Sequence, residues 1–310
     1  MKRKFMYGFA SGAMALAGCG KVGDVQVFFE PEETVFGLVS GPDEENIVDG
    51  WNVEYDKFLI TMGNFKATST ASDQVLEEPD FFVIDLINGA PAGGLILAEF
   101  KDVDAVRFDG VSYEVQPADA GTQGIGTVVQ ADLDQMRAEG LSWLIQGKLV
   151  EAVAGAGQSC DPADRTVCVA AAEIPFEFKI AAKTRWSQCE EQPGGNLGFA
   201  VTAGGTVATK PTMHGDHWFF NNITIGSEET DRRAQHFADA AFDQVQAGGA
   251  VLVDLDVLAA IPAAELFPAD LYTLSGALVS VNNGEDYVIA QTHPSGHLNG
   301  EGECVPEVIQ

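Results

Sequence analysis

The sequence predicts a mainly β protein: an antiparallel β-sandwich with helical decoration in its C-terminal third. Apolar residues alternate with polar ones in many short segments, as at Ile174, Phe176 and Phe178, and this period of two is typical of half-buried strands. Glycine, proline and aspartate separate these segments, as expected of turns. Most of the patterns typical of helices come after residue 227. Many short strands followed by late helices favour a decorated sandwich.

The expected elements follow from these patterns in chain order. Strands are expected at residues 25–29, 51–60, 80–87, 105–115, 141–153, 173–186, 197–203 and 206–213. One helix is expected in the first half, at residues 132–140, where Gly140 is a stop signal. Later helices are expected at 227–241, 254–261 and 266–279, the first with Ser227 as its N-cap.

The chain is long enough to bury a sizeable core. It has 310 residues, of which 46% are hydrophobic, and this length allows one large domain or two smaller ones. An acidic tether is expected at residues 19–50. After it we expect β-rich regions at 51–155 and 156–310, the second with helices and histidine motifs. The boundary is weak, so residues 51–310 are equally compatible with one domain.

The N-terminus has the layout of an export signal. Residues 1–4 are Met-Lys-Arg-Lys, and the apolar residues 5–15 form a stretch too short to span a membrane. The next four residues, Leu-Ala-Gly-Cys at 16–19, resemble the lipobox of bacterial lipoproteins. The resemblance implies that residues 1–18 are removed as a signal peptide and that Cys19 carries the lipid.

The strong negative charge limits the partners of the chain. The net charge is −29, and loss of the three basic residues of the signal takes it to −32. Such a surface repels the nucleic-acid backbone and anionic lipid headgroups. We therefore expect no nucleic-acid partner, and attachment to the membrane through the lipid alone. The expected location is the bacterial cell envelope, and Gly20 after Cys19 favours the outer membrane. An envelope protein partner stays open.

The remaining four cysteines suit an oxidising compartment. Their even number favours two disulfides, for which three pairings exist. Cys160 and Cys168 flank a short segment that begins with Asp-Pro, so we expect them to close a turn. Cys189 then pairs with Cys304, which ties the C-terminal tail to the middle of the chain. A thiolate metal site is disfavoured, because no Cys-x-x-Cys spacing occurs.

Clustered histidines are the strongest functional signal. His214 and His217 form a His-x-x-His motif after a predicted strand, and His297 is expected on a glycine-rich loop, seven residues before Cys304. Imidazole is a common ligand of zinc and copper, which take two or three histidines with a carboxylate or water. Because the Cys189–Cys304 bond would hold the two segments together, we expect the three rings to form one metal site.

Two carboxylates are candidates to complete this site. Asp216 and Glu301 would each provide an oxygen ligand or accept a hydrogen bond from a ligating ring. In the alternative interpretation, the chain is a non-enzymatic adhesion or scaffold lipoprotein whose histidines only make structural hydrogen bonds. Catalysis by a histidine–aspartate pair is less favoured, because the common hydrolase and nucleotide-binding motifs are absent from the sequence.

The histidine motifs also carry a resemblance. Residues 51–65, 107–113, 214–220 (HGDHWFF) and 296–304 (GHLNGEGEC) resemble segments of a group of uncharacterised bacterial surface lipoproteins. The resemblance covers most of the mature chain and implies an exported, β-rich lipoprotein. It implies no activity, so the metal hypothesis depends on the chemistry of the histidines.

Overall fold

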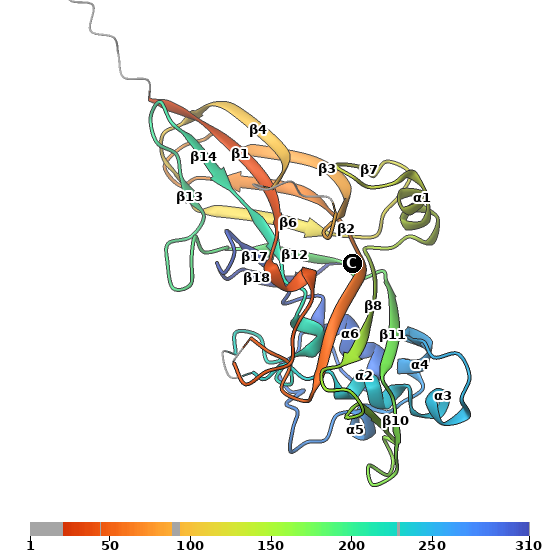
Figure 1. Cartoon of the computed structure of the whole chain (residues 1–310). Coiled ribbons are helices and arrows are strands. Elements are labelled where there is room, and N and C mark those ends of the chain that lie inside the picture. Colours follow the sequence, from red (N-terminus) through yellow and green to blue (C-terminus); the bar gives the residue numbers. More distant parts are fainter. Residues whose placement is uncertain (1–20, 44, 89–93, 228–229, 310) are drawn as a thin grey trace, which may run out of the picture.

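The computed structural model describes residues 21–43, 45–88, 94–227 and 230–309. The predicted signal peptide and Cys19 lie outside these ranges. The described chain is mainly β with short helices late in the sequence, which confirms the predicted fold class (Figure 1). In Figure 1 most strands gather at one end of the molecule, and α2 to α6 gather at the other.

The elements have the following bounds. The strands are β1 (Val22–Pro31), β2 (Trp51–Thr68), β3 (Leu76–Asp85), β4 (Leu95–Asp104), β5 (Arg107–Phe108), β6 (Gly110–Val115), β7 (Gln123–Gly124), β8 (Trp143–Glu151), β9 (Gln158–Cys160), β10 (Cys168–Ala170), β11 (Glu173–Ile180), β12 (Thr184–Ser187), β13 (Phe199–Ala200), β14 (Thr206–Thr209), β15 (Pro211–Met213), β16 (Val253–Asp254), β17 (Gly296–Leu298) and β18 (Val305–Val308). The helices are α1 (Gln130–Glu139), α2 (Gln235–Ala240), α3 (Phe242–Ala247), α4 (Leu255–Ala259), α5 (Ala263–Leu266), α6 (Gly284–Gln291) and the 3₁₀ turns η1 (Glu33–Phe36) and η2 (His217–Phe219).

Two sheets supply most of the framework. In the described chain the larger has nine strands in the order β16-β11-β8-β2-β6-β12-β18, with β3 and β7 attached beside β2. The smaller has five strands in the order β14-β1-β15-β17, with β4 also paired to β1. Most pairs are antiparallel, but β1 lies parallel to β14 and β15. These parallel pairs join the first described strand to strands almost 200 residues later, and local alternation cannot reveal such a pairing.

The interior is rich in aromatic side chains. Phe58, Trp143 and Trp218 pack edge to face, with ring centroids 5.6 to 6.3 Å apart. Trp51 and Trp186 are also buried, as the sequence predicts for tryptophans within strand patterns. Trp218 directly follows His217, so this core holds the chain on which one of the histidines lies.

Helix prediction succeeded where start and stop signals were local. The expected helix at 132–140 is α1, which ends at Gly140 in the left-handed conformation that glycine favours (φ 61°). Similarly, α4 begins after Asp254, whose side chain caps the helix by accepting from the Val257 N–H. The expected helix at 227–241 is wrong at its start, because α2 begins only at Gln235.

The expected helix at 266–279 is wrong. α5 ends at Leu266, and Pro268 follows, which disfavours helical backbone at the residue before it. The last helix, α6, was missed, although Asn283 is a clear N-cap that accepts from the Asp286 N–H at 2.8 Å. Its short length, eight residues, provides little periodicity to detect.

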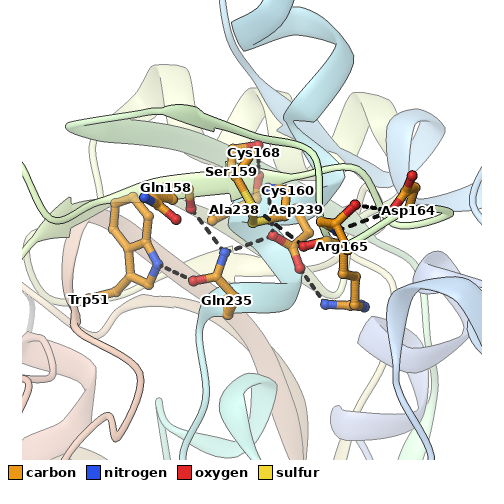
Figure 2. The surroundings of a disulfide bond; sticks show 11 residues. Trp51, Gln158, Ser159, Cys160, Asp164, Arg165, Cys168, Gln235, Ala238 and Asp239 are labelled. Carbon is orange, nitrogen blue, oxygen red and sulfur yellow. Dashed lines mark hydrogen bonds and ion pairs between the residues drawn. A yellow bond between two sulfur atoms is a disulfide. The ribbon is translucent and has the colours of Figure 1, made fainter.

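Both predicted disulfides are present. Cys160–Cys168 joins β9 to β10, and Cys189–Cys304 joins the chain after β12 to the chain before β18. Figure 2 shows how the first bond sits beside α2: Asp239 accepts from the Cys160 N–H at 2.9 Å and from the Arg165 guanidinium at 2.7 Å. The disulfide hairpin is thereby held to the helical end of the molecule. None of the helices in the described part of the chain is both long and apolar enough to cross a membrane.

Candidate metal centre

Three histidines from distant parts of the chain converge in the structure. One possible ligand atom from each of His214, His217 and His297 lies within 4.8 Å of the other two. The ring centroids of His214 and His297 are 4.2 Å apart, and His217 lies 5.8 and 5.7 Å from them. The structure therefore brings together the same three rings that the sequence selects as a metal site.

Strand pairing places these rings. The short strands β15 and β17 are antiparallel, and Thr212 pairs with His297. His214 directly follows β15, and its N–H donates to the Ser295 carbonyl at 3.1 Å. His217 begins the 3₁₀ turn η2. We expected His297 on a loop, and this was wrong: it lies at the centre of a strand, which orients its ring more firmly than a loop would.

Two glycines let the histidine segments pack closely. A Cβ atom at Gly215 would lie 2.7 Å from the Thr34 carbonyl oxygen, so only glycine fits against η1 there. The Gly215 N–H donates to the Thr34 hydroxyl at 2.8 Å, and the Tyr55 hydroxyl donates to the Gly215 carbonyl. A Cβ atom at Gly296 would lie 2.4 Å from the Trp186 ring. Close packing therefore requires both glycines.

The three rings are buried, and several of their nitrogens lack partners. Each of the three histidines is only 7% exposed to solvent. The Nδ1 atom of His217 and both ring nitrogens of His297 have no hydrogen bond within the described structure. The Pro294 carbonyl lies close to His297 without the alignment of a normal hydrogen bond. Unpaired buried nitrogens are costly, and a metal ion would satisfy them.

Burial also keeps two of the rings neutral. The pKa of His217 is well below 6.5 because burial disfavours the charged ring, and the neighbouring His214 and Arg232 add repulsion. The pKa of His297 is also well below 6.5, chiefly through burial and then through repulsion from the other two histidines. Neutral imidazole is the form that binds metal ions, so both rings are ready to do so without losing a proton.

Two carboxylates flank His214. The Oδ1 atom of Asp216 lies 3.9 Å from His214 Nδ1, and the Oε2 atom of Glu32 lies 4.0 Å from the same nitrogen. Asp216 is fully buried, and its other oxygen accepts from Arg232 Nε at 2.6 Å. The Nε2 atom of His214 is 3.2 Å from the Gly300 carbonyl oxygen. Asp216 is thus a neighbour of the ligand group rather than one of its members.

A pocket of about 810 Å³ opens beside the three rings, and all three line it. Glu301, expected as a possible ligand, is exposed, lines the pocket and does not belong to the ligand group. Cys304 also lines the pocket, so the long disulfide closes near the site as expected. Sequence reasoning missed Glu32 and Arg232. Glu32 lies far from the histidine motifs along the chain, and Arg232, 15 residues after His217, carries no local signal.

The remaining two histidines lie elsewhere. His293 is buried, and its Nδ1 atom is 2.8 Å from the Thr184 hydroxyl. His236 is also buried, 3.1 Å from the Tyr272 hydroxyl, and it packs among aromatic rings. Both are structural histidines with neutral rings, because burial lowers the pKa of His293 to about 4 and that of His236 to about 3.

Comparison of the chain with family models, curated proteins and solved structures found no match. The geometry of the site therefore carries the functional argument. The resemblance to surface lipoproteins stays a prediction.

Proposed function

We propose that this protein binds one transition-metal ion, zinc or copper, through His214, His217 and His297. The observation that carries the proposal is the convergence of three buried imidazoles whose possible ligand atoms lie within 4.8 Å of one another. Three histidines with one further position for water or another ligand is a common arrangement for zinc. Copper(II) is also well served by imidazole nitrogens.

The distances allow binding after a small inward movement. In a tetrahedral zinc site with Zn–N bonds of about 2.0–2.1 Å, the ligand nitrogens lie about 3.3 Å apart. The separation of 4.8 Å is the upper limit for the three pairs here. The widest pair must therefore close by up to about 1.5 Å, which side-chain rotations provide. Binding should consequently make the site more rigid.

The unpaired nitrogens favour metal binding over a purely structural role. A structural histidine is expected to pair at least one ring nitrogen. His293 and His236 each pair Nδ1 with a hydroxyl and leave Nε2 unpaired. His297 has neither ring nitrogen paired. This contrast supports a metal site.

The ligand set also limits the choice of metal. The four cysteines of the described chain are joined in disulfides, so no thiolate is present to select soft ions such as copper(I). Asp216 and Glu32 lie beside His214. Because Nε2 of that ring donates to the Gly300 carbonyl at 3.2 Å, Nδ1 is the nitrogen that would bind the metal, and the carbonyl would hold the ring in place.

For the cellular setting we propose a lipid-anchored protein of the bacterial envelope. The lipobox-like residues at 16–19 support this proposal, and the two disulfides suit an oxidising compartment. Replacing Cys19 with Ala should release the protein from the membrane fraction. If the variant stays with the membranes as firmly as the native protein, the anchor proposal is wrong.

Metal binding can be tested directly by calorimetric titration of the metal-free protein with zinc and with copper. We expect one ion per chain with a Kd below about 1 µM. His297→Ala and His217→Ala should each weaken binding by a factor of about 100 or more, because each substitution removes one of the three ligands. His293→Gln is the matched control, because it also alters a buried histidine but lies outside the group.

Folding must be measured alongside affinity. Circular dichroism and urea unfolding of each metal-free variant would show whether it keeps the native structure. Folded native protein that binds neither ion would refute the proposal and favour the scaffold alternative. Equal losses in His293→Gln and His297→Ala would do the same, because the effect would then come from altered packing.

A further inference from the structure

The site is incomplete as a coordination sphere. The group of candidate ligands in the described chain ends at three histidines, whereas zinc usually takes four ligands. All three rings line the pocket of about 810 Å³. A fourth ligand can therefore reach the metal from the pocket side, as a water molecule or as part of a bound molecule.

The pocket has a strongly negative lining. Carboxylates from five separate places along the chain surround it, whereas the described lining residues include one arginine and no lysine. The carboxylates are those of Glu32, Glu33, Glu45, Glu190, Asp216, Glu301 and Glu303. The arginine, Arg232, already binds Asp216 through two nitrogens, at 2.5 and 2.6 Å. The lining therefore attracts cations and repels anions.

The same pocket also offers apolar surface. Leucine, valine, isoleucine, phenylalanine and proline side chains form part of its wall. These residues are Leu38, Val39, Phe220, Ile223, Ile225, Pro294, Val305 and Pro306. A simple hydrated cation would gain nothing from this surface, whereas an organic molecule would bury its carbon atoms against it. The volume lies within the range of pockets that hold small organic ligands.

We infer that the pocket binds a small organic cation, which carries an apolar body and places a neutral donor atom on the metal held by the three histidines. This inference rests on the proposed metal-binding function and deepens it by naming the ligand class. His217 and His297 are both more than nine-tenths buried, line the pocket and have unpaired nitrogens. The acidic lining alone would not define a site, but these rings and the cavity do.

Three imidazole compounds of similar size test the charge preference. Each can place one ring nitrogen on zinc, and their side chains differ in charge: N,N,N-trimethylhistamine is cationic, 4-propylimidazole is neutral and imidazole-4-propionate is anionic. The quaternary ammonium group cannot bind a metal, so it reports only on the pocket. Calorimetry on the zinc-loaded protein should show about five-fold tighter binding of the cation than of the neutral compound, and weaker binding of the anion. Lower salt should widen the difference.

A double variant tests the origin of the preference. Glu33→Gln with Glu45→Gln removes two exposed carboxylates of the pocket, and the cation preference should fall from about five-fold to about three-fold. The matched control is Glu77→Gln with Glu99→Gln, which removes two exposed carboxylates from β3 and β4, outside the pocket lining. We expect the control to keep the five-fold preference.

The possible outcomes distinguish a failure of the cationic-ligand inference from a failure of the metal-binding proposal. If the protein binds no zinc, both fail. If zinc binds but the three compounds bind equally, the metal proposal stands and the cationic ligand class is refuted. If the cation binds equally well to metal-free protein, coordination through the fourth position is refuted. In cobalt(II)-loaded protein, a change in the visible spectrum on adding the cation would support that coordination directly.

Discussion

The long disulfide should stabilise the fold far more than the short one. Cys189–Cys304 closes a loop of 115 residues, and Cys160–Cys168 closes one of 8 residues. A cross-link restricts the unfolded chain, and the entropy that it removes grows with the logarithm of the loop length. This relation gives about 5 kcal/mol for the long loop and about 2.5 kcal/mol for the short one at 25 °C.

The test replaces each cysteine pair with alanine, which adds no polar group at the buried positions 189 and 304. Urea unfolding at 25 °C should show that the Cys189→Ala/Cys304→Ala variant loses about twice the free energy lost by the Cys160→Ala/Cys168→Ala variant. The slope of the free energy against urea should also rise more in the first, because a freed unfolded chain exposes more surface.

The site offers a second measurement on the same variants. β15 pairs with β17 directly through the backbone, so we expect the folded variant to keep the histidine group and its metal affinity within a few-fold. Equal losses of stability in the two variants would refute the entropic reasoning. They would show that native contacts around each bond, and not the length of the closed loop, decide its contribution.

Three further predictions concern packing, charge and ionisation. Gly296→Ala should destabilise the fold by about 1–3 kcal/mol and weaken metal binding, because the added Cβ would collide with the Trp186 ring. Urea unfolding measures the first effect and calorimetry the second. Arg165→Ala should lower the free energy of unfolding by about 1–2 kcal/mol, because it removes one partner of the buried Asp239. The loss stays modest because the arginine is partly exposed to solvent. An unchanged midpoint in urea unfolding would contradict this. The pKa of His236 is about 3 in the folded protein and about 6.5 in the unfolded chain. Between these values only the unfolded chain binds the proton. The free energy of unfolding should therefore fall by up to about 1.4 kcal/mol per pH unit as the pH drops from 6.5 towards 3. His236→Gln should make that decline less steep in unfolding curves measured at several pH values.

The sequence by itself determined the features that depend on neighbouring residues. Alternation at Ile174, Phe176 and Phe178 identified β11, and the stop signal at Gly140 identified the end of α1. The even number of cysteines left after Cys19, together with one short spacing, led to both disulfides. The histidine pair at 214–217 was visible as a motif. These signals are local in the chain, and local backbone preferences act over a few residues.

Only the tertiary structure decided how these pieces combine. The pairing of Thr212 with His297 joins positions 85 residues apart, and the neighbouring Gly296 packs against the Trp186 ring, which comes from yet another part of the chain. The ion pair between Asp216 and Arg232, which occupies one oxygen of that carboxylate, is likewise a matter of packing. Long-range contacts reflect the shape and burial of the whole core, and these are not encoded in any single window of sequence.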